Sequence, residues 1–384
     1  MVRISSINVF SFDIRLKEPF RISFQTFTHV ENILVVIKTD SELIGYGEAA
    51  PFKPITGDSR EEAIKFSSYA VGRLLGMDPT NIEEIHKTLE EIEKLTGLRS
   101  QTVKAAIDMA CYDILGKMKN MPVYKILGAK KPNIIPNTIT IGIKSIHETE
   151  KTAREYLEKF RENGLKRIKL KLSGNPRDDY ERVMVVAKLF DGELTLDANQ
   201  AYVDPDTAVR VFRKLYDELG DRIVLIEEPC PKGDLDKMKY VKEHVDIPIF
   251  ADESAATYED AVKIAKQNAA DGINIKLQKA GGIFWGLKIA EIAHEYGLKL
   301  MVGCMLESGI SISAGVHFAT AVRDVINTDL DSDLTLPLDI VDENTRPLFK
   351  NGARIPKDAP GLGIKLKPWV LDLIESNLVV QRII

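Results

Sequence analysis

Short apolar runs recur along the second part of the chain at intervals that fit one strand plus one helix. From about residue 130, each run ends in polar residues and is followed by a stretch whose apolar positions have helical spacing. The runs are RIKLKLSG (167–174), LTLDANQ (194–200), IVLIEEP (223–229), IPIFADES (247–254), GINIKLQKAGG (272–282), KLMVGCMLES (299–308) and VINTDLDSD (325–333). Continuous apolar strands that alternate with helices predict a parallel sheet covered by helices, and this many units predict a closed TIM-type barrel.

The residues before and after these repeats follow other patterns. Residues 1–50 alternate like antiparallel strands and residues 59–120 have helical periodicity, which together predict a small α+β domain. Gly and Pro residues recur near the end of the chain in KDAPGLGIKLKPW, a pattern typical of turns and loops. We therefore expect an α/β protein with an α+β capping domain over 1–125, a barrel over 126–350 and a C-terminal segment over 351–384 that packs back on the capping domain.

Charge and composition argue against several classes of function. The net charge of −5 disfavours a nucleic-acid or anionic membrane surface, and no run approaches the roughly 18 apolar residues of a transmembrane helix. The first residues alternate like a strand and lack the apolar core of a signal peptide. The cysteines Cys111, Cys230 and Cys304 are far apart, which fits a reducing cytoplasm. We expect a cytoplasmic protein with a small-molecule substrate and no nucleic-acid or membrane partner, and a homo-oligomer is compatible with such a barrel.

Five of the predicted strands end in a charged residue. These residues are Lys171, Asp197, Glu227, Asp252 and Lys276, separated by 26, 30, 25 and 24 positions. Because the C-terminal ends of TIM-barrel strands all face one mouth, the five side chains should converge there. The three carboxylates cannot crowd together as anions without a cation, and an all-oxygen set of ligands suits Mg²⁺.

The two lysines of this set should face each other across the mouth. Lys171 and Lys276 are four strands apart, and such strands are diametrically opposite in a ring of eight. One lysine could then remove a proton from a substrate carbon while the other returns a proton on the opposite face. Lys169 shares a strand face with Lys171, so its like charge would lower the pKa of that base.

Each feature also has a purely structural explanation. Lysines in a strand can guard an exposed sheet edge, and a single Asp or Glu after a strand can cap the next helix. Five charged residues at matching spacing favour the barrel site over these separate explanations.

The motifs at these positions resemble those of the enolase superfamily, and in particular its muconate-lactonising-enzyme subgroup. They read Lys169-Leu-Lys171, DANQ, EEP, ADES and NIKLQKAGG, together with GYGEAAP (45–51) and AAIDMACYDILGK (105–117) in the first domain. The resemblance covers nearly the whole chain. It implies a modified TIM barrel of the (β/α)7β type, with a capping domain that the C-terminal segment completes.

The resemblance also implies roles for individual residues. The acid/base pair would be Lys171 and Lys276, and one Mg²⁺ per active site would be held by Asp197, Glu227 and Asp252. Lys169 would lie beside the substrate, and the supporting residues would be Asn199, Glu253 and Glu307.

The sequence TDLDSD favours one reaction of the subgroup. Asp329 and Asp331 would share a face of a late strand, where two carboxylates could bind one ammonium group. This matches the dipeptide epimerases, whose D-x-D motif binds the free amino terminus of the substrate. The same resemblance implies substrate contacts by Thr140, Cys304 and Leu306. The alternatives are an acidic turn for the Asp residues and ordinary strand packing for the others.

We therefore expect an isomerase that uses Mg²⁺ to epimerise the C-terminal residue of a dipeptide. The reaction would be a two-lysine 1,1-proton transfer through an enediolate. The alternatives within the subgroup are a cycloisomerase, an o-succinylbenzoate synthase and an N-succinylamino acid racemase. A non-catalytic metal-binding protein, or a hydrolase with a metal-activated water, would leave two opposed lysines without a purpose.

Two positions depart from the expected pattern. By the same resemblance, epimerases acting on Ala-Glu carry an arginine at the position of Gln25, which Phe24 and Phe27 flank here. A less acidic and even apolar substrate side chain is therefore expected, although Arg21 could partly substitute for that arginine. Glu228 stands where glutamine is typical, and it would either favour a basic or polar group or pair with a nearby lysine.

Overall fold

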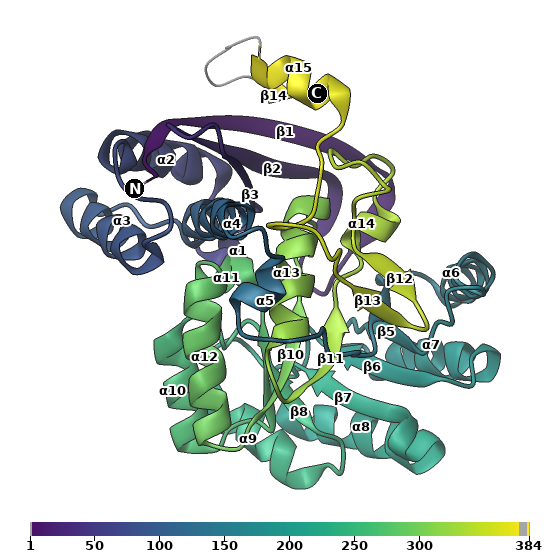
Figure 1. Cartoon of the computed structure of the whole chain (residues 1–384). Helices are drawn as coiled ribbons and strands as arrows, with labels where there is room; N and C mark the ends of the chain where they lie inside the picture. The colour runs from purple at the N-terminus through teal and green to yellow at the C-terminus, as the bar shows by residue number, and fades with distance from the viewer. Residues whose placement is uncertain (1, 376–381, 384) are drawn as a thin grey trace.

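An antiparallel sheet from the start of the chain lies over a barrel formed by the second part, as Figure 1 shows for the computed structural model, which describes residues 2–375, 382 and 383. Its strands are β1 (Ile4–Arg21), β2 (Thr26–Thr39) and β3 (Ile44–Ala49), which pair in chain order. At the outer edge β14 (Arg382–Ile383) pairs in parallel with β1. The antiparallel sheet predicted for the start of the chain is confirmed.

The helices that follow this sheet in the chain are α1 (Lys53–Thr56), α2 (Arg60–Leu74), α3 (Ile82–Thr96), α4 (Gln101–Met118) and α5 (Val123–Ile126). Of these, α2, α3 and α4 cover one face of the sheet. A capping box of Ser59 and Glu62 fixes the start of α2. The apolar faces of α2, α3 and α4 form one core with the sheet, in which Phe66 and Leu89 pack with Ile33.

Helix α4 approaches β3 unusually closely because both contain small residues. A Cβ added to Gly47 would lie 1.8 Å from the carbonyl oxygen of Ala106, and one added to Gly45 would lie 2.1 Å from that of Ala110. The glycines of GYGEAAP and the alanines of AAIDMACYDILGK therefore permit a contact that larger residues would block.

Within the described residues, the eight strands of the barrel sheet are parallel and follow one another in chain order from β4 to β11. They are β4 (Thr138–Ile141), β5 (Arg167–Lys171), β6 (Glu193–Asp197), β7 (Ile223–Glu227), β8 (Ile249–Ala251), β9 (Gly272–Ile275), β10 (Lys299–Gly303) and β11 (Val325–Asp329). Thr138 Oγ1 donates to the carbonyl of Thr328 at 3.2 Å, which nearly closes the ring between the last and first strands. The predicted barrel is confirmed.

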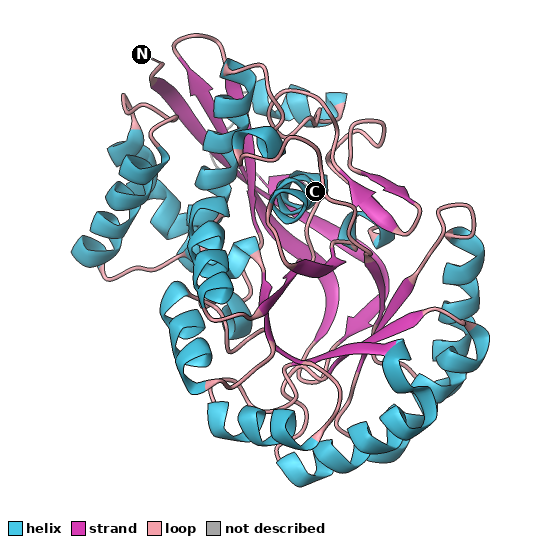
Figure 2. Ribbon diagram, turned by 60° about the horizontal axis from the view of Figure 1, so that its bottom comes forward, coloured by secondary structure: helices cyan, strands magenta, loops and turns pink. Residues whose placement is uncertain are grey.

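Helices surround the barrel, as Figure 2 shows. They are α6 (Ile146–Lys159), α7 (Pro176–Leu189), α8 (Pro205–Leu219), the 3₁₀ turn η1 (Gly220–Arg222), α9 (Leu235–His244), α10 (Tyr258–Gln267), α11 (Leu277–Ala280), α12 (Ile283–Glu295) and α13 (Gly309–Ala321). Ile168 and Leu170 belong to the core that these helices cover. Because side chains alternate along a strand, Lys169 and Lys171 point to the other face, into the barrel.

After the barrel the chain returns toward the first sheet. Its elements are α14 (Ser332–Thr335), the hairpin of β12 (Leu348–Lys350) and β13 (Ala353–Ile355), and α15 (Pro368–Glu375). The amide of Leu362 donates to Asp113 on α4 at 2.9 Å, and the amide of Val123 donates to Gly361 at 3.0 Å. Among the described helices, none is both long and apolar enough to cross a membrane.

Candidate active site at the mouth of the barrel

A cavity of about 610 Å³ lies between the C-terminal ends of the barrel strands and the first domain. Its lining includes Lys171, Lys276, Thr140 and Asp329 from the barrel. The opposite wall of the cavity is formed by strand β1, the segment that follows it and the segment around Phe52. The structure therefore brings strand-end residues from distant parts of the sequence to one cavity, as expected for a barrel of this type.

Three carboxylates form a buried cluster in the barrel beside this cavity. Asp197 and Glu227 are paired in register at the ends of β6 and β7, and Asp252 follows β8. One ligand oxygen from each lies within 4.8 Å of the others, and all three residues are buried. Asn274 Nδ2 donates to Glu227 Oε2 at 2.8 Å. This compact all-oxygen set fits the ligand preference of Mg²⁺.

Lys169 is the cation at the centre of this cluster. Its Nζ lies 2.6 Å from Asp329 Oδ2, 2.8 Å from Glu227 Oε1 and 3.0 Å from Asp197 Oδ2. Although burial opposes its charge, these carboxylates raise the pKa of Lys169 well above its usual value. Lys169 therefore stays positively charged.

Lys171 contacts the same oxygen as its neighbour, because its Nζ lies 2.6 Å from Asp197 Oδ2. Burial opposes the charge of Asp197, but Lys169 and Lys171 together lower its pKa to about 2. Lys169 thus places a positive charge beside Lys171, as the spacing of the two lysines in the strand predicted.

Lys276 lies on the opposite side of the barrel from Lys171. It follows β9, four strands from β5, and its Nζ lies 2.8 Å from Asp252 Oδ2. Burial lowers the pKa of Lys276, but the charges of Asp252, Glu253 and Asp197 together raise it above its usual value.

Sequence reasoning missed a fourth lysine in the cluster. Lys279 Nζ lies 2.5 Å from Asp252 Oδ1, contacts the carbonyl of Asp252, and donates to the carbonyl of Asn274 at 3.2 Å. Lys276 and Lys279 therefore hold the two oxygens of one carboxylate. The only signal was the second lysine of NIKLQKAGG, whose direction depends on the turn of α11.

The expected supporting residues lie around the carboxylates. Asn199 donates its backbone N–H to Asp197 Oδ1 at 2.9 Å and its side-chain amide to Glu253 Oε1 at 3.0 Å. Glu228 accepts from the amides of Asp252 and Ser254 at 2.7 and 3.2 Å and from the Ser254 hydroxyl. Glu228 thus fixes the turn that carries Asp252, and it is absent from the lining of the main cavity.

The two acids of the D-x-D motif differ in their surroundings. Asp329 ends β11, accepts from Thr138 and Thr140 hydroxyls at 3.0 and 2.9 Å, and pairs with Lys169. Asp331 has left the strand and accepts the amide of Thr140 at 2.7 Å. Both line the cavity, and burial together with Asp329 raises the pKa of Asp331 to about 7.

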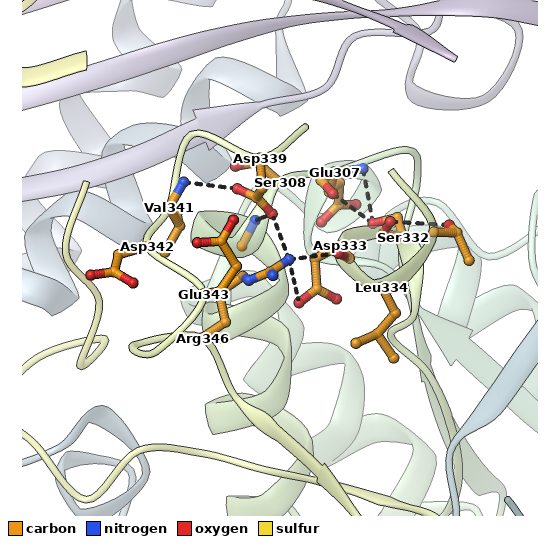
Figure 3. A network of polar contacts seen from close by, with 12 residues as sticks. Glu307, Ser308, Ser332, Asp333, Leu334, Asp339, Val341, Asp342, Glu343 and Arg346 are labelled. Carbon is orange, nitrogen blue, oxygen red and sulfur yellow. Dashed lines mark hydrogen bonds and ion pairs between the residues drawn. The ribbon is translucent and has the colours of Figure 1, made fainter. Parts of the chain in front are cut away.

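The loop that carries Asp331 is anchored by a polar network, drawn in Figure 3. Ser332 Oγ donates to the carbonyl of Glu307 at 2.6 Å, and Arg346 donates to the carbonyl of Asp333 at 2.6 Å and to Asp339 Oδ2 at 3.4 Å. Glu307 accepts the amide of Met305 at 2.6 Å, and burial raises the pKa of Glu307. It acts within this loop, and no direct contact with Lys276 is present among the described residues.

The remaining predicted contacts lie on the cavity wall. Cys304 and Leu306 line it from the barrel, and Gln25 lines it from the turn between β1 and β2. The Ser23 hydroxyl donates to the carbonyl of Asn199 at 2.5 Å, which ties this turn to the barrel. Arg21 is exposed and is not among the residues that line the cavity.

Comparisons with known proteins agree with this geometry. Residues 5–128 match the family "Mandelate racemase / muconate lactonizing enzyme, N-terminal domain", and residues 151–370 match "Enolase C-terminal domain-like". The chain is 35% identical over 370 residues to a hydrophobic dipeptide epimerase of Enterococcus faecalis, covering 94% of this chain and 99% of that protein. It is 30% identical over 387 residues to an N-succinyl-L-Arg/Lys racemase of Bacillus cereus, covering 100% of both.

A solved structure has the same architecture. It is a dipeptide epimerase from Enterococcus faecalis complexed with Mg and the dipeptide L-Leu-L-Tyr, with a TM-score of 0.86 and 34% identity. The similarity covers 94% of this chain and 99% of that one.

Proposed function

Because this chain belongs to the mandelate racemase and muconate lactonizing enzyme family, we propose that it is a Mg²⁺-dependent dipeptide epimerase that inverts the C-terminal residue. The observation that carries the proposal is the state of Asp331. This carboxylate is buried, lines the cavity, and has no ion pair among the residues that the structure describes. A buried carboxylate without a cation is unfavourable, so the site calls for a positively charged ligand group such as a peptide amino terminus.

Two lysines would carry out the proton transfer. With the amino terminus at Asp331, the α-carbon of the second residue would lie between Lys171 and Lys276. One lysine would take the α-proton and the other would return a proton on the opposite face, which inverts the centre. Asp197, Glu227 and Asp252 would hold Mg²⁺, which supplies positive charge for the negative charge that develops on the substrate carboxylate.

The wall of the first domain favours an apolar side chain on the inverted residue. Phe27 and Phe52 line the cavity with their rings 4.9 Å apart, and the buried Ile55 lies beside them in the lining. Among the charged lining residues of this domain, Glu18 is paired with Lys144 at 2.6 Å and Glu31 with Arg60 at 3.7 Å, and the exposed Lys17 also lines the cavity. A charged side chain packed against Phe27 and Phe52 would lose hydration without gaining a partner from these rings.

Deuterium uptake tests the proposal directly. The protein is incubated in D₂O with Mg²⁺ and a library of L,L-dipeptides, and mass spectrometry follows the α-carbon of the C-terminal residue. We expect one deuteron and a matching L,D product, with apolar residues preferred over Glu by roughly tenfold or more. Lys171→Ala and Lys276→Ala should each lower turnover by about 10²- to 10⁴-fold. The absence of uptake in every dipeptide would contradict the proposal.

A second candidate is racemisation of N-succinylamino acids, which the relative from Bacillus cereus supports. Such substrates have no ammonium group, so Asp331→Asn separates the two activities. If the enzyme is a dipeptide epimerase, this variant should raise the KM for dipeptides by tenfold or more. If N-succinylamino acids are the substrates, wild type should act on them and Asp331→Asn should retain that activity.

We also assign the enzyme to a reducing compartment such as the cytoplasm. The cysteines Cys111, Cys230 and Cys304 are all free, and the first two are buried. Free buried thiols are usual in proteins that fold without disulfides.

A further inference from the structure

Two motifs of the first domain, GYGEAAP and AAIDMACYDILGK, take no part in the proposed chemistry, and both contain fully buried acids. In GYGEAAP, Glu48 lies on β3 with no exposed surface, and it neither lines the cavity nor belongs to the carboxylate cluster. Because a buried carboxylate needs several donors, its partners indicate what it holds in place.

The donors to Glu48 come mainly from the barrel. The amide of Ser308 donates to Oε1 at 2.9 Å, its hydroxyl donates to Oε2 at 2.7 Å, and the amide of Ser311 donates to Oε2 at 3.2 Å. These groups form the start of α13, the helix that follows β10. Glu48 therefore fixes the N-terminal end of a barrel helix from the other domain.

A second set of contacts connects Glu48 to the wall of the cavity. Asn32 Nδ2 donates both to Glu48 Oε1 and to the carbonyl of Leu306, each at 2.8 Å. Leu306 lines the cavity and precedes Ser308 by two residues. Asn32 and Glu48 thus hold both ends of a short segment whose first residue faces the substrate space.

A third set reaches the segment that carries Lys276. Gln278 Nε2 donates to the carbonyl of Glu48 at 2.9 Å and to Ser311 Oγ at 2.8 Å, while Gln278 Oε1 accepts the amide of Ala50 at 3.0 Å. Gln278 lies two residues after Lys276. One buried network therefore connects a cavity wall and a lysine-bearing turn to β3.

From these contacts we propose that Glu48 is a positioning residue of the active site. Its carboxyl group sets the place of Leu306 through the start of α13, and its backbone carbonyl supports the turn after Lys276. Its effect on turnover rests on the proposed function, whereas its effect on the 303–311 segment does not.

Asp108 provides a matched control. It lies on α4, is equally buried, and accepts the amides of Ile283 and Phe284 at 2.6 and 3.2 Å, so it fixes the start of α12; it also contacts His86 Nε2 at 2.8 Å. Neither Ile283 nor Phe284 lines the cavity. Loss of Asp108 should therefore weaken domain docking without moving the substrate wall.

The experiment compares Glu48→Gln with Asp108→Asn, since each change keeps the shape of the side chain and replaces one acceptor oxygen with an amide group that can only donate. Hydrogen exchange followed by mass spectrometry should show faster exchange in 303–311 for the first variant and in 281–286 for the second. At a temperature where both are folded, Glu48→Gln should lower kcat/KM by at least tenfold, and Asp108→Asn should stay within threefold of wild type.

The outcomes separate this inference from the proposed function. Unchanged exchange in 303–311, or equal losses of kcat/KM in the two variants, would overturn the positioning role. If wild type shows no α-deuteration, the function is wrong and the exchange comparison still decides whether Glu48 holds the segment. Should Glu48→Gln fail to fold, Asn32→Ala removes the amide that connects Glu48 to Leu306 and leaves the contacts of Glu48 with Ser308 and Ser311 in place. Because Asn32 also lines the cavity, the deciding result for this variant is the local increase in exchange, with a lower kcat/KM expected beside it.

Discussion

Each strand-end lysine shares a carboxylate with a second lysine, and only one of these two pairs could be predicted. Lys169 was predictable because a strand repeats every two residues, which places it beside Lys171. Lys279 follows the strand end by three residues, and that spacing alone does not indicate where its side chain points. It reaches Asp252 only because Leu277–Ala280 fold as a helical turn.

Lys279 should matter for catalysis although it does not line the cavity. Lys279→Met keeps the length of the side chain but leaves Asp252 Oδ1 without its cation, so the carboxylate loses its orientation. Partners that orient metal-binding carboxylates typically contribute about 10- to 100-fold to activity or metal affinity. We expect a loss of that size in kcat at saturating Mg²⁺. The exposed Lys288→Met is the control, and a Lys279 variant within threefold of wild type would refute this role.

At the scale of single elements, the strands could be predicted more reliably than the segments that follow them. Apolar runs located the first residues of β5, β6 and β7 to within one position, because burial on both faces demands continuous apolar sequence. Asp331 was expected in a strand with Asp329, but its ψ of −6° takes the chain out of the extended conformation before α14. Local backbone turns of this kind depend on contacts such as the Thr140 amide, which no periodicity indicates.

Helix α13 also contains a pH-sensitive contact with the C-terminal segment. His317 is fully buried; its Nδ1 lies 3.2 Å from the amide nitrogen of Tyr124, and its Nε2 lies 3.2 Å from the carbonyl of Leu362. This geometry fits a neutral ring that accepts at Nδ1 and donates at Nε2. Burial lowers the pKa of His317 to about 4 from its ordinary 6.5.

This contact predicts a loss of stability in acid. Because the unfolded state binds the proton first, the free energy of unfolding should fall as the pH drops from 6.5 toward 4, by about 3 kcal/mol at most from this group. His317→Gln should flatten this part of the profile, measured by urea unfolding at several pH values. The exposed His147→Gln should keep the wild-type slope, and an unchanged slope in the His317 variant would refute the assignment.

For the whole molecule, the barrel followed from the repeats in the sequence, whereas the contacts that dock the capping domain on it did not. The repetition of strand and helix is a local pattern, so it can be recognised in the sequence without knowledge of the fold. Docking instead relies on buried acids whose partners are far away in sequence. Asp113 is an example, because it accepts amides from Tyr46 at 3.1 Å and from Leu362 at 2.9 Å.

The close approach of β3 and α4 makes the whole molecule sensitive to a single methyl group. A Cβ on Gly47 would lie 1.8 Å from the backbone oxygen of Ala106, and neither backbone can move away without shifting Glu48 or Asp108 from the helices they cap. Gly47→Ala should therefore destabilise the protein by more than about 4 kcal/mol, in the range of severe packing defects.

Gly72→Ala is the matched control with the opposite expected sign. Gly72 lies in α2, where an added Cβ meets no atom within 4 Å, and alanine favours a helix interior by about 1 kcal/mol over glycine. Thermal unfolding should thus show a lowered Tm for Gly47→Ala and a slightly raised Tm for Gly72→Ala. If Gly47→Ala kept the wild-type Tm, the interface between β3 and α4 would have to be looser than these distances allow. A rigid connection between Glu48 and the cavity wall would then be less well supported as well.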